Sequence, residues 1–304
     1  MISRRGFIKT SAAAVMVSGP YFTGKVFAEG NADLGVMTGS DIDATVRAAV
    51  AAVGGIGAYV KQGDRVAIKP NLSFASPVKR AATTNPDVLK SVMNLCLEAG
   101  AKQVLVVDHP LQDAAIIGEK SPVAEVVKDT KNATMILLSM TENLFKETKI
   151  ERGTAMKSTG VAKILNEVDV LINLPVAKSH SACVVSLGIK GNLGLVMDRP
   201  AYHNSSDFNQ SLADLATIIR ADLTIVDAVR ALSTRGPQGP GKVVELNTIV
   251  AGKDPVAVDA YAVTLTPWNN LQAKGRNIQH LIYAAEMGLG ELDPTKLTIS
   301  KKTV

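Results

Sequence analysis

The residue types best suited to chemistry gather between residues 169 and 195, in the sequence DVLINLPVAKSHSACVVSLGIKGNLGL. Lys178 and Lys190 can neutralise a carboxylate or a phosphate. His180 can move a proton near neutral pH. Asn192 lies among three glycines, whose backbone N–H groups can approach an anion closely. We therefore expect a ligand-binding site in this stretch.

The stretch begins with an apolar run, Val170 to Ile172, that predicts a buried strand ending at Asn173. Pro175 cannot continue a hydrogen-bonded ladder, so we expect an extended or loop segment after it. In an extended segment, side chains two residues apart project from the same face. Lys178 and His180 are therefore expected to present a fixed cation beside a titratable imidazole.

Three further apolar runs, at residues 65–68, 104–107 and 223–226, also predict buried strands that end in polar side chains. These side chains are Lys69, Asn71, Asp108, His109 and Asp227. Parallel strands place their carboxyl ends along one edge of a sheet, which is the usual ligand position in an open α/β fold. Taken singly, Asp108 and Asp227 can equally be cap or turn residues, and a lysine can equally be a solvated loop charge. Together, the four strand ends favour a site.

Helical patterns alternate with these strands along the chain. Asn85-Pro86, Ser121-Pro122 and Asp254-Pro255 each combine a capping side chain with proline in the first helical turn. The alternation predicts an α/β fold, a mainly parallel sheet with helices on both faces. We expect residues 29–304 to form a single domain of this kind.

The N-terminus carries an export pattern. The sequence SRRGFIK at residues 3–9 is close to the twin-arginine signal, an apolar run follows, and a small-residue site ends at Ala28. We expect residues 1–28 to be a signal peptide recognised by the twin-arginine translocase, and the remaining chain to be periplasmic. Without the four basic side chains of this segment, the formal charge of +5 falls to +1, which gives no support for a nucleic-acid partner.

The two cysteines, Cys96 and Cys183, are too few for the four thiolates of an iron–sulfur cluster. Cys96 lies in an apolar helical pattern and is expected to be a buried thiol. Histidine and aspartate at the strand ends suit several divalent metals, although no compact ligand motif such as H-E-x-x-H is present. The dinucleotide and Walker A fingerprints are also missing from the sequence.

Six motifs in order carry a family resemblance. They are Lys69-Pro70-Asn71, Thr84-Asn85-Pro86, Glu98 to Ala101, Asn173-Leu174-Pro175 through Lys178 and His180, Gly188 to Asn192, and Asp254 to Asp259. Together they resemble the family called domain of unknown function 362, over nearly all of residues 29–304. The resemblance implies no particular reaction, because the biochemical role of the family is unresolved. Some relatives carry appended ferredoxin-like cysteine clusters, which this chain lacks.

Two functional hypotheses follow. In the first, an exported enzyme or enzyme-like protein acts on a small anion at the sheet edge. Its expected ligand-binding residues are Lys69, Asn71, Asn173, Lys178, Lys190, Asn192, Asp227 and Arg235, and its expected catalytic residues are His180, His109 and Asp108. In the second, the chain is a non-enzymatic binding or assembly factor for an exported redox partner. A deep polar pocket favours the first, and an exposed apolar patch favours the second.

Overall fold

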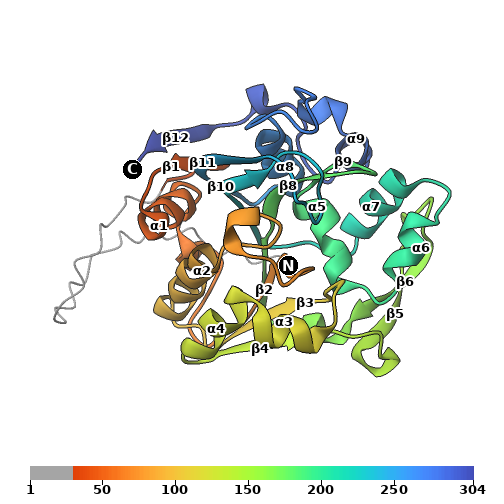
Figure 1. The fold of residues 1–304 in the computed structure, drawn as a ribbon, viewed down its shortest axis with the longest axis horizontal. Coiled ribbons are helices and arrows are strands. Elements are labelled where there is room, and N and C mark those ends of the chain that lie inside the picture. Colours follow the sequence, from red (N-terminus) through yellow and green to blue (C-terminus); the bar gives the residue numbers. More distant parts are fainter. Residues whose placement is uncertain (1–29) are drawn as a thin grey trace, which may run out of the picture.

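The computed structural model describes residues 30–304 (Figure 1). The predicted signal peptide, residues 1–28, lies outside the described residues. The strands are β1 (Leu34–Thr38), β2 (Arg65–Pro70), β3 (Gln103–Asp108), β4 (Ala133–Leu137), β5 (Phe145–Lys149), β6 (Ser158–Ala162), β7 (Val170–Leu174), β8 (Val176–His180), β9 (Val184–Ser186), β10 (Leu223–Leu232), β11 (Val243–Gly252) and β12 (Ile299–Thr303). The helices are α1 (Ile42–Ala52), α2 (Pro86–Glu98), α3 (Ala114–Lys120), α4 (Pro122–Asp129), α5 (Gly188–Gly191), α6 (Arg199–His203), α7 (Phe208–Ala216), α8 (Pro255–Val263) and α9 (Gln279–Glu286).

One large sheet organises the described residues. Its main path has the order β12-β1-β11-β10-β7-β2-β3-β4. The strands β10, β7, β2, β3 and β4 run parallel to one another, and β11 runs antiparallel to both β10 and β1. The strand β8 pairs with the second half of β10 and with β9, while β5 and β6 form a separate antiparallel pair. The sheet is thus mainly parallel.

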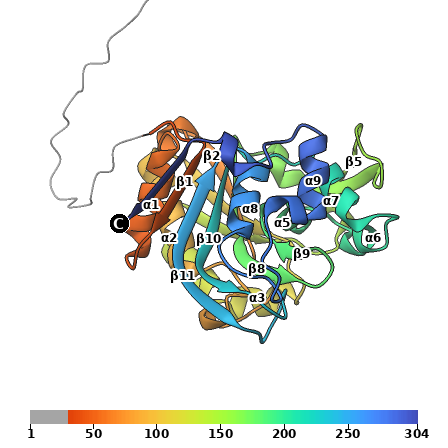
Figure 2. The same ribbon diagram turned by 90° about the horizontal axis from the view of Figure 1, so that it is seen from above.

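Helices cover both faces of this sheet (Figure 2). Alternation along β2 shows the two faces, because Val66 and Ile68 belong to one apolar cluster and Ala67 to the other. The cluster with Val66 includes buried residues of α1, α2 and α4. The cluster with Ala67 includes buried residues of α5, α7, α8 and α9. The predicted fold class, α/β with helices on both faces, is confirmed.

Local capping explains where several helices begin. Asn85 accepts from the backbone N–H of Asp87, and Asp254 accepts from the N–H groups of Val256 and Ala257. In both helices proline follows in the first turn, where its missing N–H costs nothing. These starts agree with the sequence prediction. Within residues 30–304, no helix is both long and apolar enough to cross a bilayer.

The two cysteines lie on opposite faces of the sheet. Cys96 of α2 is buried in the cluster that contains Val66, and Cys183 is buried in the cluster that contains Ala67. Both thiols are free, and the intervening sheet prevents a disulfide between them. The predicted burial of Cys96 is confirmed.

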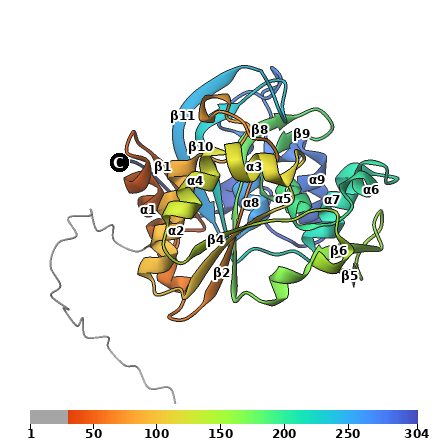
Figure 3. The same ribbon diagram turned by 60° about the horizontal axis from the view of Figure 1, so that its bottom comes forward.

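Of two strands at the sheet edge, one agrees with the sequence prediction and one differs from it. The segment after Pro175 is the regular strand β8, which is the extended form that the sequence favoured. Strand β10 does not end at Asp227, because it continues to Leu232 through a register shift between Ala228 and Arg230. The long β10–β11 hairpin therefore extends past the carboxyl ends of β2 and β7. Figure 3 shows α3, β8 and β9 at this same end of the molecule.

Candidate functional site

A cavity of about 320 Å³ lies at the carboxyl ends of the parallel strands. Loops after β2 and β3, the end of β8, the α5 region and α6 all contribute to its wall. The lining residues are Lys69, Asn71, Ser73, Asp108, Leu111, His180, Ser181, Lys190, Gly191, Leu193, Gly194, Arg199, Pro200, His203 and Pro237. Three cationic side chains and one carboxylate therefore surround the space.

A buried ion pair forms one part of this wall. Lys69 Nζ lies 3.2 Å from Asp108 Oδ1, and the same ammonium donates to the carbonyl of Pro70 at 2.6 Å. Asp108 also accepts from the backbone N–H groups of Leu72, at 2.6 Å, and His109, at 3.0 Å. Burial lowers the pKa of Lys69, and the neighbouring Asp108 opposes that shift. The pair is fixed from several sides and leaves little freedom for either group.

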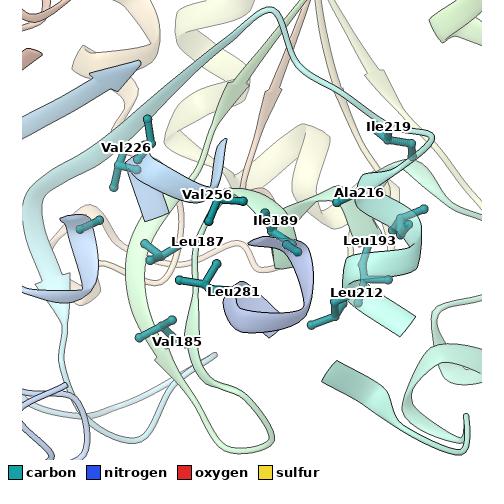
Figure 4. Packing of buried hydrophobic residues seen from close by; sticks show 14 of the residues in the cluster. Val185, Leu187, Ile189, Leu193, Leu212, Ala216, Ile219, Val226, Val256 and Leu281 are labelled. Carbon is teal, nitrogen blue, oxygen red and sulfur yellow. The ribbon is translucent and has the colours of Figure 1, made fainter. Parts of the chain in front are cut away.

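Helix α5 carries Lys190, which lines the cavity, and is held in place by a side chain of α8. Asp259 of α8 accepts from the backbone N–H groups of Gly188 and Ile189, at 2.9 and 2.8 Å, at the start of this short helix. Figure 4 shows the side chain of Ile189 among the apolar residues of the neighbouring helices, including Leu281. One residue further along a helix is about 100° around its axis, so Lys190 leaves the core and lines the cavity. Burial raises the pKa of Asp259 to about 7, although the two N–H donors act in the opposite direction.

Lys190 itself is half-buried. No hydrogen bond or ion pair joins its Nζ to any residue within 30–304. Burial lowers the pKa of Lys190 to about 8; Cys183 and Asp108 raise it, and Lys69 and Arg199 lower it further. Near neutral pH it is thus a mostly charged ammonium without a partner, at the surface of the cavity.

Arg199 supplies the third cation from the first residue of α6. Its guanidinium donates to the carbonyl of His109 and, at 2.7 Å, to the carbonyl of Pro110. Asp198 caps this short helix by accepting from the N–H of Ala201 at 3.0 Å. The loop after β3 thus holds the guanidinium beside the cavity.

Two glycines of this region allow close packing, and Gly191 and Gly194 line the cavity. A Cβ at Gly194 would lie 1.9 Å from Asp108 Oδ1 and 2.6 Å from Lys69 Cε. A Cβ at Gly188 would lie 3.0 Å from Asp259 Oδ1. The carbonyl of Gly194 also accepts from the backbone N–H of His109 at 2.8 Å. These glycines let the backbone pack directly on the buried charged side chains.

Two histidines, His180 and His203, also line the cavity. The rings of His180 and His203 are stacked, with centroids 6.1 Å apart, and Phe208 stacks on His203 at 4.2 Å. The backbone N–H of Ala182 donates to His180 Nδ1 at 3.2 Å, so the neutral ring carries its proton on Nε2. Burial, with Lys190 next in importance, lowers the pKa of His180 to about 3. This geometry suits His180 to donating a hydrogen bond better than to acting as a base.

Lys178 does not line the cavity, although it was predicted to bind the ligand. Its Nζ is buried and donates to Asn71 Oδ1 at 2.9 Å and to the carbonyl of Ala82 at 2.6 Å. The ammonium also lies 5.3 Å from the ring centroid of Phe74. Lys178 therefore fastens the loop after β2 to β8. Because both Lys178 and His180 are buried, we expect replacement of either residue to lower stability.

Asn173 and Asn192 lie beneath α5 instead of in the cavity wall. Asn173 Nδ2 donates to the carbonyl of Gly188 at 2.9 Å and to Asn192 Oδ1 at 3.2 Å. Asn192 Nδ2 in turn donates to the carbonyl of Ile219 at 3.2 Å. Both amides thus support the backbone that carries Lys190, and neither is among the lining residues.

Three more predicted site residues lie outside the cavity lining. Asp227 is buried within β10, where it accepts from the N–H groups of Asn85, at 2.7 Å, and Val229, at 3.1 Å. Burial raises its pKa to about 6, against these two donors. Arg235 is exposed and is not among the lining residues, although Pro237 two positions later is. The ring of His109 is hydrogen-bonded through Nδ1 to the carbonyl of Val196 at 2.8 Å. The contribution of His109 to the site is its backbone carbonyl, which accepts a hydrogen bond from Arg199.

Sequence reasoning missed Arg199 and Asp259 as site residues. Asp198 before Arg199-Pro200 is a helix-start signal that could have located α6. No local signal links Asp259 to α5, because the contact joins residues about 70 positions apart. In residues 30–304 no group of three or more His, Cys, Asp or Glu side chains is arranged to hold a metal ion.

The sequence of residues 66–264 matches the family model described as "Domain of unknown function (DUF362)". This match covers about two thirds of the chain. The chain belongs to this family. The motifs that suggested the resemblance, from the Lys69 loop to the start of α8, fall inside the matched range.

A curated relative of this DUF362 chain is the thylakoid-associated protein sll1697 of Synechocystis sp. (strain ATCC 27184 / PCC 6803 / Kazusa). The two sequences are 30% identical over 227 residues, which cover 71% of this chain and 67% of the relative. The name of that relative refers to an association with thylakoids and to no reaction.

Among solved structures, the lactate racemase apoprotein from Thermoanaerobacterium thermosaccharolyticum is similar, with a TM-score of 0.46 and 13% identity. The similarity covers 72% of this chain and 53% of the racemase, so the chain spans about half the length of that protein. Both proteins have an α/β fold. At this identity and TM-score, nothing about activity passes from one to the other.

Proposed function

We propose that this chain binds a small organic or inorganic anion in the cavity at the carboxyl edge of its sheet. The observation that carries the proposal is the charge of the wall. Lys69, Lys190 and Arg199 face the space, and Asp108 is the one carboxylate among the lining residues. An anion entering this partly enclosed cavity would find an excess of positive charge, with hydroxyl and amide groups nearby.

The three cations contribute in different ways. Lys69 is paired with Asp108, and the guanidinium of Arg199 already holds two carbonyls. Both add positive potential without being free to move. Lys190, which no described residue engages, is the direct contact that we assign to the anion. His180 Nε2–H is a further donor for an oxygen of the same ligand.

Sulfate titration by calorimetry tests this proposal, because sulfate stays fully charged across the relevant pH range. We expect saturable binding at pH 7 that weakens as the pH rises through about 8, since Lys190 loses its proton there. The loss should approach roughly tenfold per pH unit, as one linked proton requires. Lys190→Arg should keep the binding and lose this pH step, because arginine stays protonated.

Lys190→Met removes the charge but keeps an unbranched side chain of similar length, so sulfate affinity should fall at least roughly tenfold. The exposed Lys131, replaced in the same way, is the matched control and should bind sulfate like the wild type. If Lys190→Met binds sulfate with unchanged affinity, the assignment of Lys190 as the direct contact to the anion is wrong. The rival function, an assembly factor for an exported redox system, predicts no saturable sulfate binding.

We also propose that the chain is exported to the periplasm by the twin-arginine translocase. Arg4 and Arg5, in the sequence SRRGFIK, support this proposal. Arg4→Lys combined with Arg5→Lys should leave the precursor in the cytoplasm, because the paired guanidinium groups are what the translocase recognises. Cell fractionation and immunoblotting would measure this. Normal periplasmic accumulation of the double variant would contradict the assignment.

A further inference from the structure

Lys190 differs from the other two cations of the cavity in its freedom. Lys69 Nζ is held by Asp108 and a backbone carbonyl, and Arg199 by two carbonyls. Over residues 30–304, nothing accepts a hydrogen bond from Lys190 Nζ. An incoming molecule therefore meets one amine that can react without first breaking a contact within the protein.

The surroundings of this amine are those that activate a lysine as a nucleophile. Desolvation and neighbouring cations both favour the neutral form, which carries the reactive electron pair. Lys69 and Arg199 supply the cations, and burial of the amine supplies the desolvation. With a pKa of about 8, Lys190 is neutral in about a tenth of molecules at pH 7.

We propose that Lys190 forms an imine with the carbonyl carbon of a small aldehyde or ketone that carries an acid group. This rests on the anion-binding function proposed above, because Lys69 and Arg199 would attract and orient the acid group of the same molecule. His180 Nε2–H would donate to the carbonyl oxygen and polarise it. The backbone N–H of Ala182 orients this ring through Nδ1, and the ring of His203 is stacked beside it.

The chemistry balances without any oxidant or reductant. The electron pair of neutral Nζ attacks the carbonyl carbon, and the carbonyl π bond becomes a hydroxyl group after proton transfer from nitrogen. The carbon–oxygen bond of this adduct then breaks. The oxygen leaves with the two hydrogens of the amine as water, and a carbon–nitrogen double bond remains.

Reductive trapping tests this step on the full chain. The protein would be treated with glyoxylate and cyanoborohydride at pH 7.5, and carboxymethylated lysines would be located by peptide mass spectrometry. We expect modification of Lys190 at a rate roughly tenfold above that of the exposed Lys131, because solvated lysines are almost entirely protonated at this pH. Sulfate should slow the reaction at Lys190 and leave Lys131 unaffected.

Two controls separate the imine from the anion site. Acetaldehyde has the same carbonyl group without a charge, so its preference for Lys190 should be smaller than that of glyoxylate and should come from the lowered pKa of the amine alone. Lys190→Arg should still bind glyoxylate and sulfate in calorimetry but should yield no adduct at residue 190. If glyoxylate competes with sulfate, yet Lys190 is modified no faster than Lys131, the imine is overturned and the anion site stands. If neither anion binds, the proposed function falls together with the imine.

Discussion

Replacing Gly194 by alanine should lower the free energy of unfolding by about 1–3 kcal/mol, the usual cost of overpacking a well-filled site. The added Cβ would lie 1.9 Å from Asp108 Oδ1 and 2.8 Å from Lys69 Nζ. Asp108 cannot move aside freely, because two backbone N–H groups and Lys69 hold it. The backbone at Gly194 is also tied to β3 through His109 N–H.

The same change should weaken sulfate binding at least roughly tenfold, because it displaces a buried charged pair of the cavity wall. Gly118→Ala in α3 is the matched control. A Cβ there meets its nearest atom, Leu137 Cδ1, at 3.8 Å, so stability should stay equal or rise by up to about 1 kcal/mol. Denaturant unfolding and calorimetry would measure both variants. Equal stability and equal affinity for the two variants would show that the close packing at Gly194 has no role.

Replacing Lys178 by alanine should have the largest effect on stability, a loss of about 3–5 kcal/mol. The change leaves the buried acceptors Asn71 Oδ1 and Ala82 O without a donor and empties the space of a fully buried stem. Lys178→Met keeps most of the stem and should cost less. Replacement of the exposed Lys131 by alanine should stay within about 0.5 kcal/mol.

The pH dependence of unfolding distinguishes the charge of Lys178 from its packing. Burial, followed by repulsion from Lys190 and Lys69, lowers the pKa of Lys178 well below its ordinary value of 10.5. The folded state thus binds this proton more weakly than the unfolded chain does. The resulting loss of stability is fully present below the pKa of Lys178 in the folded state, and it disappears as the pH rises towards 10.5. Wild-type stability should therefore rise with pH relative to Lys178→Met; parallel pH profiles would contradict the shift.

Much of the sheet was predictable because its strands are uniformly buried. The apolar runs of β2, β3 and β7 have no other plausible state in a chain with alternating helices. Strand β8 was harder, since Lys178 and His180 are unusual in a fully buried strand. Its stability depends on pairing with β10 and β9, and on partners such as Asn71, which come from distant parts of the chain.

The site was predictable to the extent that it follows from strand ends. Lys69 and Asp108 meet because β2 and β3 are parallel neighbours whose carboxyl ends reach the same edge. Asp227 does not line the cavity, because its strand pairs with β11 and continues past the edge of the sheet. Arg199 depends on the tertiary placement of α6, and Asp259 on the packing of α8 against α5. Residue spacing contains neither piece of information.

The position of a bound anion tests the account most directly. Crystals grown without sulfate and soaked in selenate, an anomalously scattering analogue of sulfate, would locate the anion without relying on a variant. We predict a selenium peak inside the cavity, with a selenate oxygen within hydrogen-bond distance of Lys190 Nζ and with Arg199 and His180 beside it. Selenium peaks found only at lattice contacts or on the outer surface, with the cavity holding no anion, would contradict the account.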